Sequence, residues 1–240
     1  MKKLLLICLM VILPLSLWAL PVENHPLADV TVLVGDMAAG GMGSGVVLTS
    51  DGYIATAAHV VHSNKLVVVV PYGDHQTFYR WARVVYLDTL QDIAILKVQI
   101  DVPLVPVKIG SYKELTIGAT ILHMGHPMGI GWLLSIGHVA SVKYDQTGRG
   151  YIFADIAGGP GSSGGGLYNE NNELVGIAQQ GIMGLGLIGI TIDHLILPIT
   201  AVILADRELA PIREEMEQLS ADAKREWEQL INPKEEDKKE

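Results

Sequence analysis

Residues 155–167 read Asp-Ile-Ala-Gly-Gly-Pro-Gly-Ser-Ser-Gly-Gly-Gly-Leu, and six of these thirteen residues are glycine. Glycine loses more backbone entropy on folding than any other residue, so this composition does not favour a packed helix or strand. The stretch therefore predicts a loop of special shape. Ser163 lies at its centre, after Gly161 and before Gly164-Gly165. Flanking glycines leave a serine hydroxyl open to a substrate carbonyl and leave backbone N–H groups free to bind an oxyanion.

Other interpretations of this loop fit less well. A P-loop needs a Lys followed by Ser or Thr, which the loop lacks. A flexible linker is not expected, because the apolar residues 174–178 that follow are typical of a strand. The pattern Gly161-x-Ser163-x-Gly165 also fits the nucleophile elbow of α/β-hydrolases. That fold needs alternating helices and strands and a histidine after the serine, for which only His194 is available.

The rest of the body is rich in short β-branched runs separated by turn signals. The runs lie at residues 30–34, 45–48, 53–57, 65–70, 81–86, 93–98, 120–124, 133–141, 151–154, 174–178 and 187–192. Asp51-Gly52, between two of them, predicts a hairpin turn, because this pair accepts positive φ angles. About a dozen short strands at regular spacing, with little helical periodicity before residue 194, predict an all-β sandwich or pair of barrels.

The C-terminal part has a different apolar period. Apolar residues recur there at steps of three and four: Leu209, Ile212, Met216, Leu219, Ala223, Trp227 and Leu230. This pattern predicts an amphipathic helix in residues 201–232, and Pro211 is suited to a first helical turn. The helix either packs on the β body, which is the favoured interpretation, or pairs with another chain as a coiled coil. The charge-dense residues 233–240 predict a disordered tail.

The N-terminus and the composition limit where the protein acts and what it binds. Lys2 and Lys3 follow Met1, and an apolar run continues from them to residue 20. This pattern predicts either a cleaved signal peptide or a membrane anchor through residues 4–20. The body is exported in both cases, to the periplasm or the outside. Cys8 is the only cysteine, so no intrachain disulfide can form. A formal net charge of -9 argues against a nucleic-acid partner.

Two residues are candidates to activate Ser163. A serine hydroxyl is a poor nucleophile at neutral pH unless an imidazole takes its proton and a carboxylate orients that imidazole. His59 follows an apolar run, and Asp92 precedes the apolar residues 93–96, where a charge is costly without a partner. Each residue alone has a structural interpretation, but with Ser163 they occur in the order His, Asp, Ser of one known catalytic triad.

Five segments of the chain carry a family resemblance. They are residues 43–48 (Gly-Ser-Gly-Val-Val-Leu), 56–61 (Thr-Ala-Ala-His-Val-Val), 92–96 (Asp-Ile-Ala-Ile-Leu), 125–129 (Gly-His-Pro-Met-Gly) and 160–165 (Pro-Gly-Ser-Ser-Gly-Gly). In order and spacing they resemble the trypsin-like serine proteases, and among them the bacterial HtrA or Deg type. The resemblance implies a chymotrypsin-like fold of two six-stranded antiparallel β-barrels over residues 25–200, with the active site between them.

The resemblance also implies roles for individual residues. His59 would be the general base, Asp92 its orienting carboxylate and Ser163 the nucleophile, and the backbone N–H groups of Gly161 and Ser163 would form the oxyanion hole. The pocket for the residue before the scissile bond would be lined by Ala157, Ala178, Gln179, Gln180 and Ile190. None of these is a buried acid that would match Arg or Lys. We therefore expect a preference for small or medium aliphatic residues such as Val or Ala.

The chain departs from the family pattern in and after the glycine loop. Ser162 and Gly166 stand where the family commonly has Asn and Pro, and Gly158-Gly159 replaces a bulkier pair. These changes predict a more flexible loop. The PDZ domain that usually follows in HtrA proteases, and behaviour that depends on it, are not expected.

Four further polar residues are expected to have no catalytic role. His123 and His126 have a spacing that suggests a metal pair, but they lack a supporting carboxylate nearby, so we expect loop histidines and no metal. His62 is expected to be exposed and to point away from the site. Asp155 is expected to accept hydrogen bonds from amides of the glycine loop.

Together these features predict an exported serine endopeptidase that forms an acyl-enzyme on Ser163 and acts on protein or peptide substrates without a metal or cofactor. The alternative is a protease-like binding or scaffold protein with negligible turnover, which the altered glycine loop and the helical C-terminus would suit. Assembly into a homo-oligomer and a membrane tether through residues 4–20 are both left open.

Overall fold

The computed structural model describes residues 25–231, apart from residues 37, 39, 63–65, 73–78 and 183–184. The predicted signal or anchor segment at residues 1–20 and the predicted tail at residues 233–240 lie outside the described residues, so both stay predictions. In the described part of the chain, none of the helices has an apolar stretch sufficient to span a bilayer.

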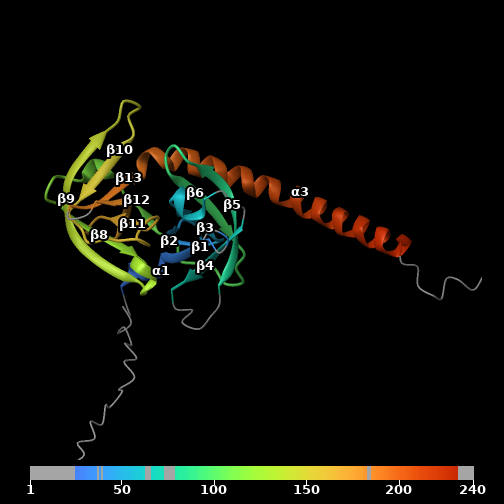
Figure 1. The fold of residues 1–240 in the computed structure, drawn as a ribbon. Helices are drawn as coiled ribbons and strands as arrows, with labels where there is room; N and C mark the ends of the chain where they lie inside the picture. The colour runs from blue at the N-terminus through green and yellow to red at the C-terminus, as the bar shows by residue number, and fades with distance from the viewer. Residues whose placement is uncertain are drawn as a thin grey trace, which may run out of the picture.

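The first half of the body forms a closed barrel of antiparallel strands in the order β1-β2-β3-β6-β5-β4 (Figure 1). Its strands are β1 (Thr31–Asp36), β2 (Gly41–Val47), β3 (Tyr53–Thr56), β4 (Leu66–Pro71), β5 (Arg80–Asp88) and β6 (Ile93–Val98). Gly52, in the turn before β3, has a φ of +98°, and a Cβ on it would lie 2.7 Å from the Val98 carbonyl oxygen. Only glycine fits this predicted turn position without strain.

The second half forms another antiparallel ring, in the order β11-β8-β9-β10-β13-β12, which closes where β11 pairs with β12. Its strands are β8 (Thr120–Gly125), β9 (Leu133–Tyr144), β10 (Gly150–Ala154), β11 (Gly166–Tyr168), β12 (Glu173–Ile182) and β13 (Gly186–Thr191). A short strand, β7 (Lys108–Ile109), runs parallel to β12 at its edge. The predicted fold of two six-stranded antiparallel barrels is confirmed.

Helical segments are short except at the C-terminus. The short ones are α1 (Pro26–Asp29), α2 (Ala58–Val61), and the 3-10 turns η1 (Tyr112–Glu114) and η2 (Pro127–Gly129). The helix α3 (Asp193–Ile231) begins beside the second barrel and passes over the first (Figure 1).

Alternation along the strands divides the core into three apolar clusters. In β6, Ile93 and Ile95 face a cluster shared by both barrels, which we call the inter-barrel cluster, whereas Ala94 and Leu96 fill the first barrel. Successive strand residues point to opposite faces, so one strand supplies both clusters. A third cluster, which includes Ile121 and other buried residues of the second ring, fills the second barrel. The inter-barrel cluster therefore fixes the two barrels against each other.

The helix α3 begins at Asp193, and not at residue 201 as expected, and it contains both Pro198 and Pro211. Proline lacks an N–H and usually ends a helix, which is why the sequence pattern placed Pro211 in a first turn. The early turns are stabilised by burial, because residues four positions apart pack into the inter-barrel cluster: Leu195, Ile199 and Ile203. Tertiary packing here outweighs the local effect of proline.

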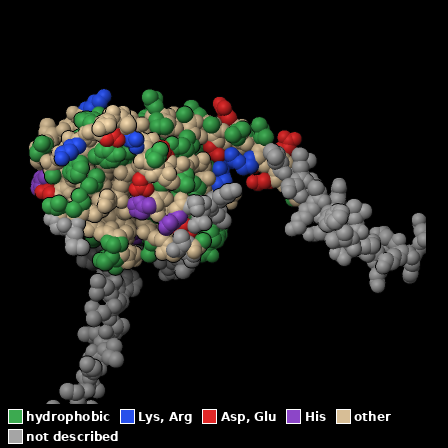
Figure 2. All heavy atoms as spheres, turned by 45° about the horizontal axis from the view of Figure 1, so that its top comes forward, with side chains coloured by type: hydrophobic (Ala, Val, Ile, Leu, Met, Phe, Trp, Pro, Cys, Tyr) green, Lys and Arg blue, Asp and Glu red, His purple; other side chains and the backbone are tan. Residues whose placement is uncertain are grey.

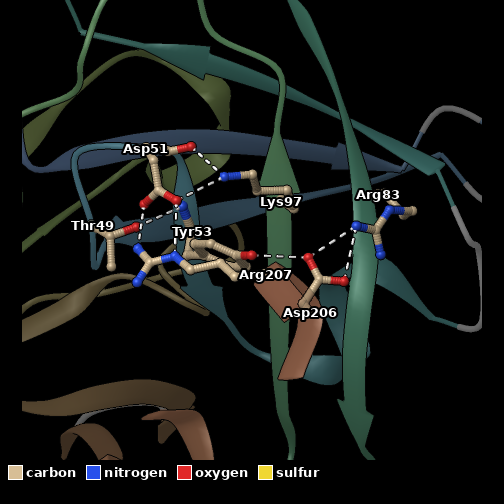
Figure 3. A network of polar contacts seen from close by, with 7 residues as sticks. All are labelled: Thr49, Asp51, Tyr53, Arg83, Lys97, Asp206 and Arg207. Carbon is tan, nitrogen blue, oxygen red and sulfur yellow. Dashed lines mark hydrogen bonds and ion pairs between the residues drawn. The ribbon is translucent and has the colours of Figure 1, made fainter. Parts of the chain in front are cut away.

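Asp206 anchors α3 to the first barrel (Figure 3). Its carboxylate accepts hydrogen bonds from the Tyr53 hydroxyl at 2.9 Å, from the Arg83 guanidinium at 3.0 Å and from Arg213 at 2.9 Å. Burial raises the pKa of Asp206, but the hydrogen bonds from Arg83 and Tyr53 outweigh burial, so the pKa lies below its ordinary value. The carboxylate is therefore ionised and paired at neutral pH.

A second ion pair lies beside this one. Arg207 donates to both oxygens of Asp51, at 2.7 and 3.1 Å, and Lys97 donates to the same carboxylate at 3.1 Å. Both cations also lie near the Tyr53 ring, with the Lys97 ammonium 4.2 Å and the Arg207 guanidinium 5.3 Å from its centroid. The favoured interpretation, that the helix packs on the β body, is confirmed for its first part. Its C-terminal part extends away from both barrels (Figure 1).

We expect Asp206→Asn to lower the free energy of unfolding by about 1–3 kcal/mol, because two guanidinium groups lose their charged partner. Urea unfolding at pH 7 measures this loss. Glu208→Gln, at an exposed position of the same helix, should change stability by less than about 0.5 kcal/mol.

The folded-state pKa of Asp206 is depressed, so its contribution is present above the ordinary pKa of 3.8 and is lost as the pH falls through the lower folded value. The difference between the unaltered protein and Asp206→Asn should therefore narrow below pH 3.8. Equal losses in Asp206→Asn and Glu208→Gln would contradict the anchoring role.

Candidate active site

His59 and Asp92 come from two loops at one end of the first barrel. His59 lies in α2, directly after β3, and Asp92 lies in the turn before β6. His59 Nδ1 is 2.7 Å from Asp92 Oδ2, and the His59 backbone N–H donates to Asp92 Oδ1 over 2.9 Å. A carboxylate only accepts, so the ring proton lies on Nδ1 in the neutral histidine. This leaves Nε2 as an acceptor for another proton.

The surroundings of this pair make His59 a stronger base. The hydrogen bond that the His59 ring donates to Asp92 raises the pKa of His59 above its ordinary value of 6.5, and this effect outweighs the lowering by partial burial. The His59 side chain is 49% exposed, so a substrate can reach it. Asp92 has a φ of +53°, a region that non-glycine residues rarely adopt. The carboxylate thus reaches His59 from a locally strained turn.

Ser163 belongs to the second barrel, in the glycine-rich loop between β10 and β11. Its hydroxyl donates to the Gln179 carbonyl oxygen over 3.1 Å, and its own carbonyl oxygen accepts a hydrogen bond from the Ser44 N–H over 2.8 Å. Within the part of the chain that the structure describes, no hydrogen bond joins the Ser163 hydroxyl to His59. The structure forms the predicted His59–Asp92 pair and directs the Ser163 hydroxyl to Gln179.

Gln179 links the two barrels at this point. Its side-chain amide donates to the carbonyl oxygen of Gln91 and, over 3.3 Å, to that of Asp92. β12 has a register shift between Ala178 and Gln180. Such a bulge re-aims a side chain, and here it turns Gln179 towards the Asp92 turn. Ser163 and Asp92 therefore share one partner, which no pattern in the sequence had indicated.

The glycine loop adopts a defined shape because its neighbours leave no room for side chains. Gly161 has a φ of +97°, and a Cβ on it would lie 2.3 Å from the His126 carbonyl oxygen. Gly164 has a φ of +85°, and its Cβ would lie 2.1 Å from the Ser44 carbonyl oxygen. Ser162, which stands where the family commonly has Asn, is buried and its hydroxyl accepts a hydrogen bond from the Gly159 N–H. These contacts oppose the flexibility expected of the loop.

Several backbone N–H groups of the loop donate hydrogen bonds to carbonyl oxygens of the protein. The Ser162 N–H donates to Gly159, the Gly164 N–H to Ala178, and the Gly165 N–H to Ser162. In contrast, the N–H groups of Gly161 and Ser163 have no acceptor among the described residues. These are the two amides that the family resemblance implies for the oxyanion hole.

A pocket of about 740 Å³ opens beside Ser163. Its lining comes from the glycine loop and from the rim of β12 and β13: Asp155, Ile156, Ala157, Gly158, Gly159, Pro160, Ser163, Gln180, Gly181, Ile182, Leu185 and Gly186. The expected pocket residues Ala157 and Gln180 are among these. The remaining three are not: Ala178 and Ile190 are fully buried in apolar clusters, and Gln179 faces the Asp92 turn. Successive side chains of β12 and of β13 point to opposite faces of the sheet, so only some of their residues face the pocket.

Asp155 differs from its expected role. Its carboxylate accepts a hydrogen bond from the His138 backbone N–H of β9, and not from amides of the glycine loop. The side chain is 56% exposed and lies at the pocket, with the His138 ring 3.6 Å away. Asp155 is therefore an acid at the pocket wall, although it is not buried and is already partnered.

His62, His123 and His126 do not line the pocket or bond to the candidate triad residues. The expectation of loop histidines was wrong for His123, which lies in β8, and is confirmed for His126, which lies between β8 and η2. Both side chains are buried. Burial lowers the pKa of each to about 4, so both are neutral at pH 7. His62 is exposed as expected, 3.4 Å from the Asp36 carboxylate. Among the described residues, no group of three His, Cys, Asp or Glu side chains could hold a metal ion.

Comparison with known proteins is consistent with this geometry. Residues 43–177 match the model of the trypsin-like peptidase domain. A probable periplasmic serine endoprotease, DegP-like, of Pseudomonas putida (strain W619) is 35% identical over 153 residues, which are 60% of this chain and 31% of that protein. The serine endoprotease DegS of Haemophilus influenzae is 31% identical over 147 residues, 59% of this chain and 42% of DegS. The chain thus spans less than half the length of these relatives.

Solved structures show the same architecture. The serine endoprotease of Yersinia pestis superposes with a TM-score of 0.63 and 25% identity, over 73% of this chain and 63% of that one. The HtrA-type protease AlgW, solved with a tripeptide, has a TM-score of 0.65 and 23% identity, over 73% and 60% of the two chains. At that identity AlgW is evidence for the fold alone.

The His59–Asp92 pair predicts an NMR titration. The imidazole of His59 should titrate above its ordinary value of 6.5, and Asp92→Asn should lower the midpoint, because the hydrogen bond and the charge that favour the protonated ring are weakened. Asn tolerates the positive φ of this position, so the turn should persist. Asp155→Asn, which removes another carboxylate near a histidine, should leave the His59 midpoint unchanged. A midpoint for His59 that is unaffected by Asp92→Asn would contradict this.

Proposed function

The chain belongs to the trypsin-like peptidase family, and we propose that it is an HtrA-type serine endopeptidase in which His59, Asp92 and Ser163 form the catalytic triad. The observation that carries the proposal is the His59–Asp92 pair at 2.7 Å, which leaves Nε2 of a raised-pKa imidazole free. The loop that holds Ser163 on the facing barrel supplies two unengaged amides.

The first step is acylation. The Ser163 hydroxyl turns from the Gln179 carbonyl towards His59 Nε2, which takes its proton as Oγ attacks the carbonyl carbon of the scissile peptide bond. The carbonyl oxygen becomes an oxyanion, which the N–H groups of Gly161 and Ser163 stabilise. The C–N bond then breaks, His59 returns the proton to the leaving amine, and the acyl group remains as an ester on Ser163.

Deacylation repeats the same chemistry with water. A water molecule enters where the amine has left, and His59 Nε2 takes its proton as the water oxygen attacks the ester carbon. The C–O bond to Ser163 breaks, and His59 returns the proton to Ser163 Oγ. Asp92 stays ionised throughout and stabilises the imidazolium in both steps.

The alternative is a protease-like binding or scaffold protein with negligible turnover. The observation that favours it is the hydrogen bond from the Ser163 hydroxyl to the Gln179 carbonyl, since a hydroxyl held there is not activated by His59. This bond is one neutral hydrogen bond, with a net value of about 0.5–1.5 kcal/mol, so a bound substrate can readily replace it. We therefore favour the endopeptidase.

Substrates and location follow from the pocket and the relatives. The pocket is walled mainly by small and aliphatic residues, which supports a preference for Val or Ala before the scissile bond. The DegP-like relatives are described as periplasmic, which supports export of this chain. On the face drawn in Figure 2, Lys and Arg side chains lie among hydrophobic and acidic ones, and one group of them gathers where the helix leaves the barrels.

The assignment of the nucleophile is tested with a fluorophosphonate probe. The unaltered protein should be labelled, Ser163→Ala should not, and Ser162→Ala should retain labelling, because the Ser162 hydroxyl is buried and bonded within the loop. Casein should likewise be cleaved by the unaltered protein and by Ser162→Ala, but not by Ser163→Ala. No labelling of the unaltered protein, with the fold intact by circular dichroism, would support the scaffold alternative.

The specificity is tested with peptides that differ only in the residue before the scissile bond. Val or Ala should exceed Arg in kcat/KM by more than about tenfold, because a buried guanidinium without a partner is costly. Asp155→Asn should not change this ratio, since the carboxylate is engaged by His138. A preference for Arg that disappears in Asp155→Asn would identify Asp155 as the specificity residue and overturn the prediction.

A further inference from the structure

Ser44 is a buried residue of β2 that contacts the nucleophile loop of the other barrel. Its N–H donates to the Ser163 carbonyl oxygen at 2.8 Å, and its hydroxyl donates to the Gly161 carbonyl oxygen at 2.7 Å. The same hydroxyl accepts a hydrogen bond from the His126 N–H at 2.8 Å, and the Ser44 carbonyl oxygen accepts one from Thr56 Oγ1 at 2.6 Å. Every polar group of Ser44 is therefore used.

The direction of these bonds follows from chemistry. A backbone N–H can only donate and a carbonyl oxygen can only accept, so the Ser44 hydroxyl must accept from His126 and donate its single proton to Gly161. Alanine at this position would leave a buried N–H and a carbonyl oxygen without partners. The hydroxyl is therefore matched to two backbone groups that belong to different loops.

The close packing around Ser44 brings β2 against the loop. A Cβ on Gly43 would lie 2.8 Å from the Ser163 carbonyl oxygen and 2.5 Å from Val60 Cγ2. The backbone of the nucleophile loop thus approaches β2 so closely that only glycine fits at position 43. Ser44 points a hydroxyl into this narrow contact between the barrels.

The Ser44 bond fixes one of the two peptide groups that flank Gly161. The carbonyl oxygen of Gly161 itself accepts a hydrogen bond from the Ser44 hydroxyl. The carbonyl oxygen of Pro160, in the peptide group before Gly161, accepts one from the Met128 N–H at 2.5 Å. In a trans peptide the N–H points opposite to the carbonyl, so the Gly161 N–H points away from Met128. Glycine accepts many φ and ψ values, and these two bonds select one.

From this geometry we infer that Ser44 is a positioning residue for the oxyanion hole: its hydroxyl holds the Gly161 carbonyl and, together with the bond from Met128 to Pro160, fixes both peptide groups of Gly161 and so the direction of the Gly161 N–H. The inference rests on the proposed endopeptidase function. Ser44 touches neither substrate nor the reacting atoms, and acts through the peptide backbone of the loop. It also couples the loop to η2 through His126, since one hydroxyl bonds both.

The test compares Ser44→Ala with Thr56→Val in the full chain. Loss of one direct oxyanion donor lowers kcat by about 10²–10³-fold, so loss of a group that orients a donor should lower kcat by about tenfold to a hundredfold. KM for a peptide substrate should change by less than about twofold, because the bond matters in the transition state. Affinity for a peptide aldehyde, which forms an oxyanion on Ser163, should fall with kcat.

Thr56→Val is the matched control, because it removes a buried hydroxyl that also bonds to Ser44 but leaves the bond to Gly161. It should retain kcat and aldehyde affinity. The His59 NMR midpoint should be unchanged in Ser44→Ala, which shows that the His59–Asp92 pair is intact.

Two results would overturn the inference alone: an unchanged kcat in Ser44→Ala, or an equal fall of kcat in Thr56→Val, which would mean a general packing role. Failure of the proposed function looks different, because the unaltered protein itself would neither react with the fluorophosphonate nor cleave peptide. That outcome would overturn both.

Discussion

The glycine-rich loop at residues 155–167 has few side chains that could hold its shape, so its backbone depends on hydrogen bonds from elements around it. The Gly161 and Ser163 carbonyls are bonded to Ser44 of the first barrel, the Pro160 carbonyl to Met128, and the Gly164 amide to Ala178. A buried backbone group without a partner costs as much as a lost hydrogen bond. The loop therefore takes hydrogen-bond partners from both barrels.

This dependence explains why the two barrels must be fixed against each other. His59 and Asp92 belong to the first barrel and Ser163 to the second, and a catalytic geometry tolerates little displacement. The inter-barrel cluster supplies the apolar contact, with residues such as Tyr53 and Ile95 from one barrel and Met124 from the other. The burial of apolar surface is non-directional and does not by itself fix the position of one barrel relative to the other. The directional hydrogen bonds of Ser44 and Gln179 fix this relative position.

The helix α3 adds to this arrangement from outside the barrels. Its first turns pack into the inter-barrel cluster, and Asp206 then pairs with Tyr53 and Arg83 of the first barrel. The apolar period of residues 209–230 predicted a helix, but its start was placed too late, because Pro198 and Pro211 are local signals against helix. Local propensity is weaker than the burial of a whole apolar face, which only the folded body provides.

The sequence by itself determined the β architecture, because alternating apolar residues and turn glycines are local patterns. It also determined the candidates His59, Asp92 and Ser163, since their order and flanking residues are read along the chain. Only the tertiary structure decided which residues hold them. Ser44 and Gly161 are 117 positions apart, and Gln179 and Asp92 are 87 positions apart. Such partners are chosen by contact across the barrel interface, where the bonding atoms are mostly backbone carbonyls that every residue has, so no pattern of side chains marks them.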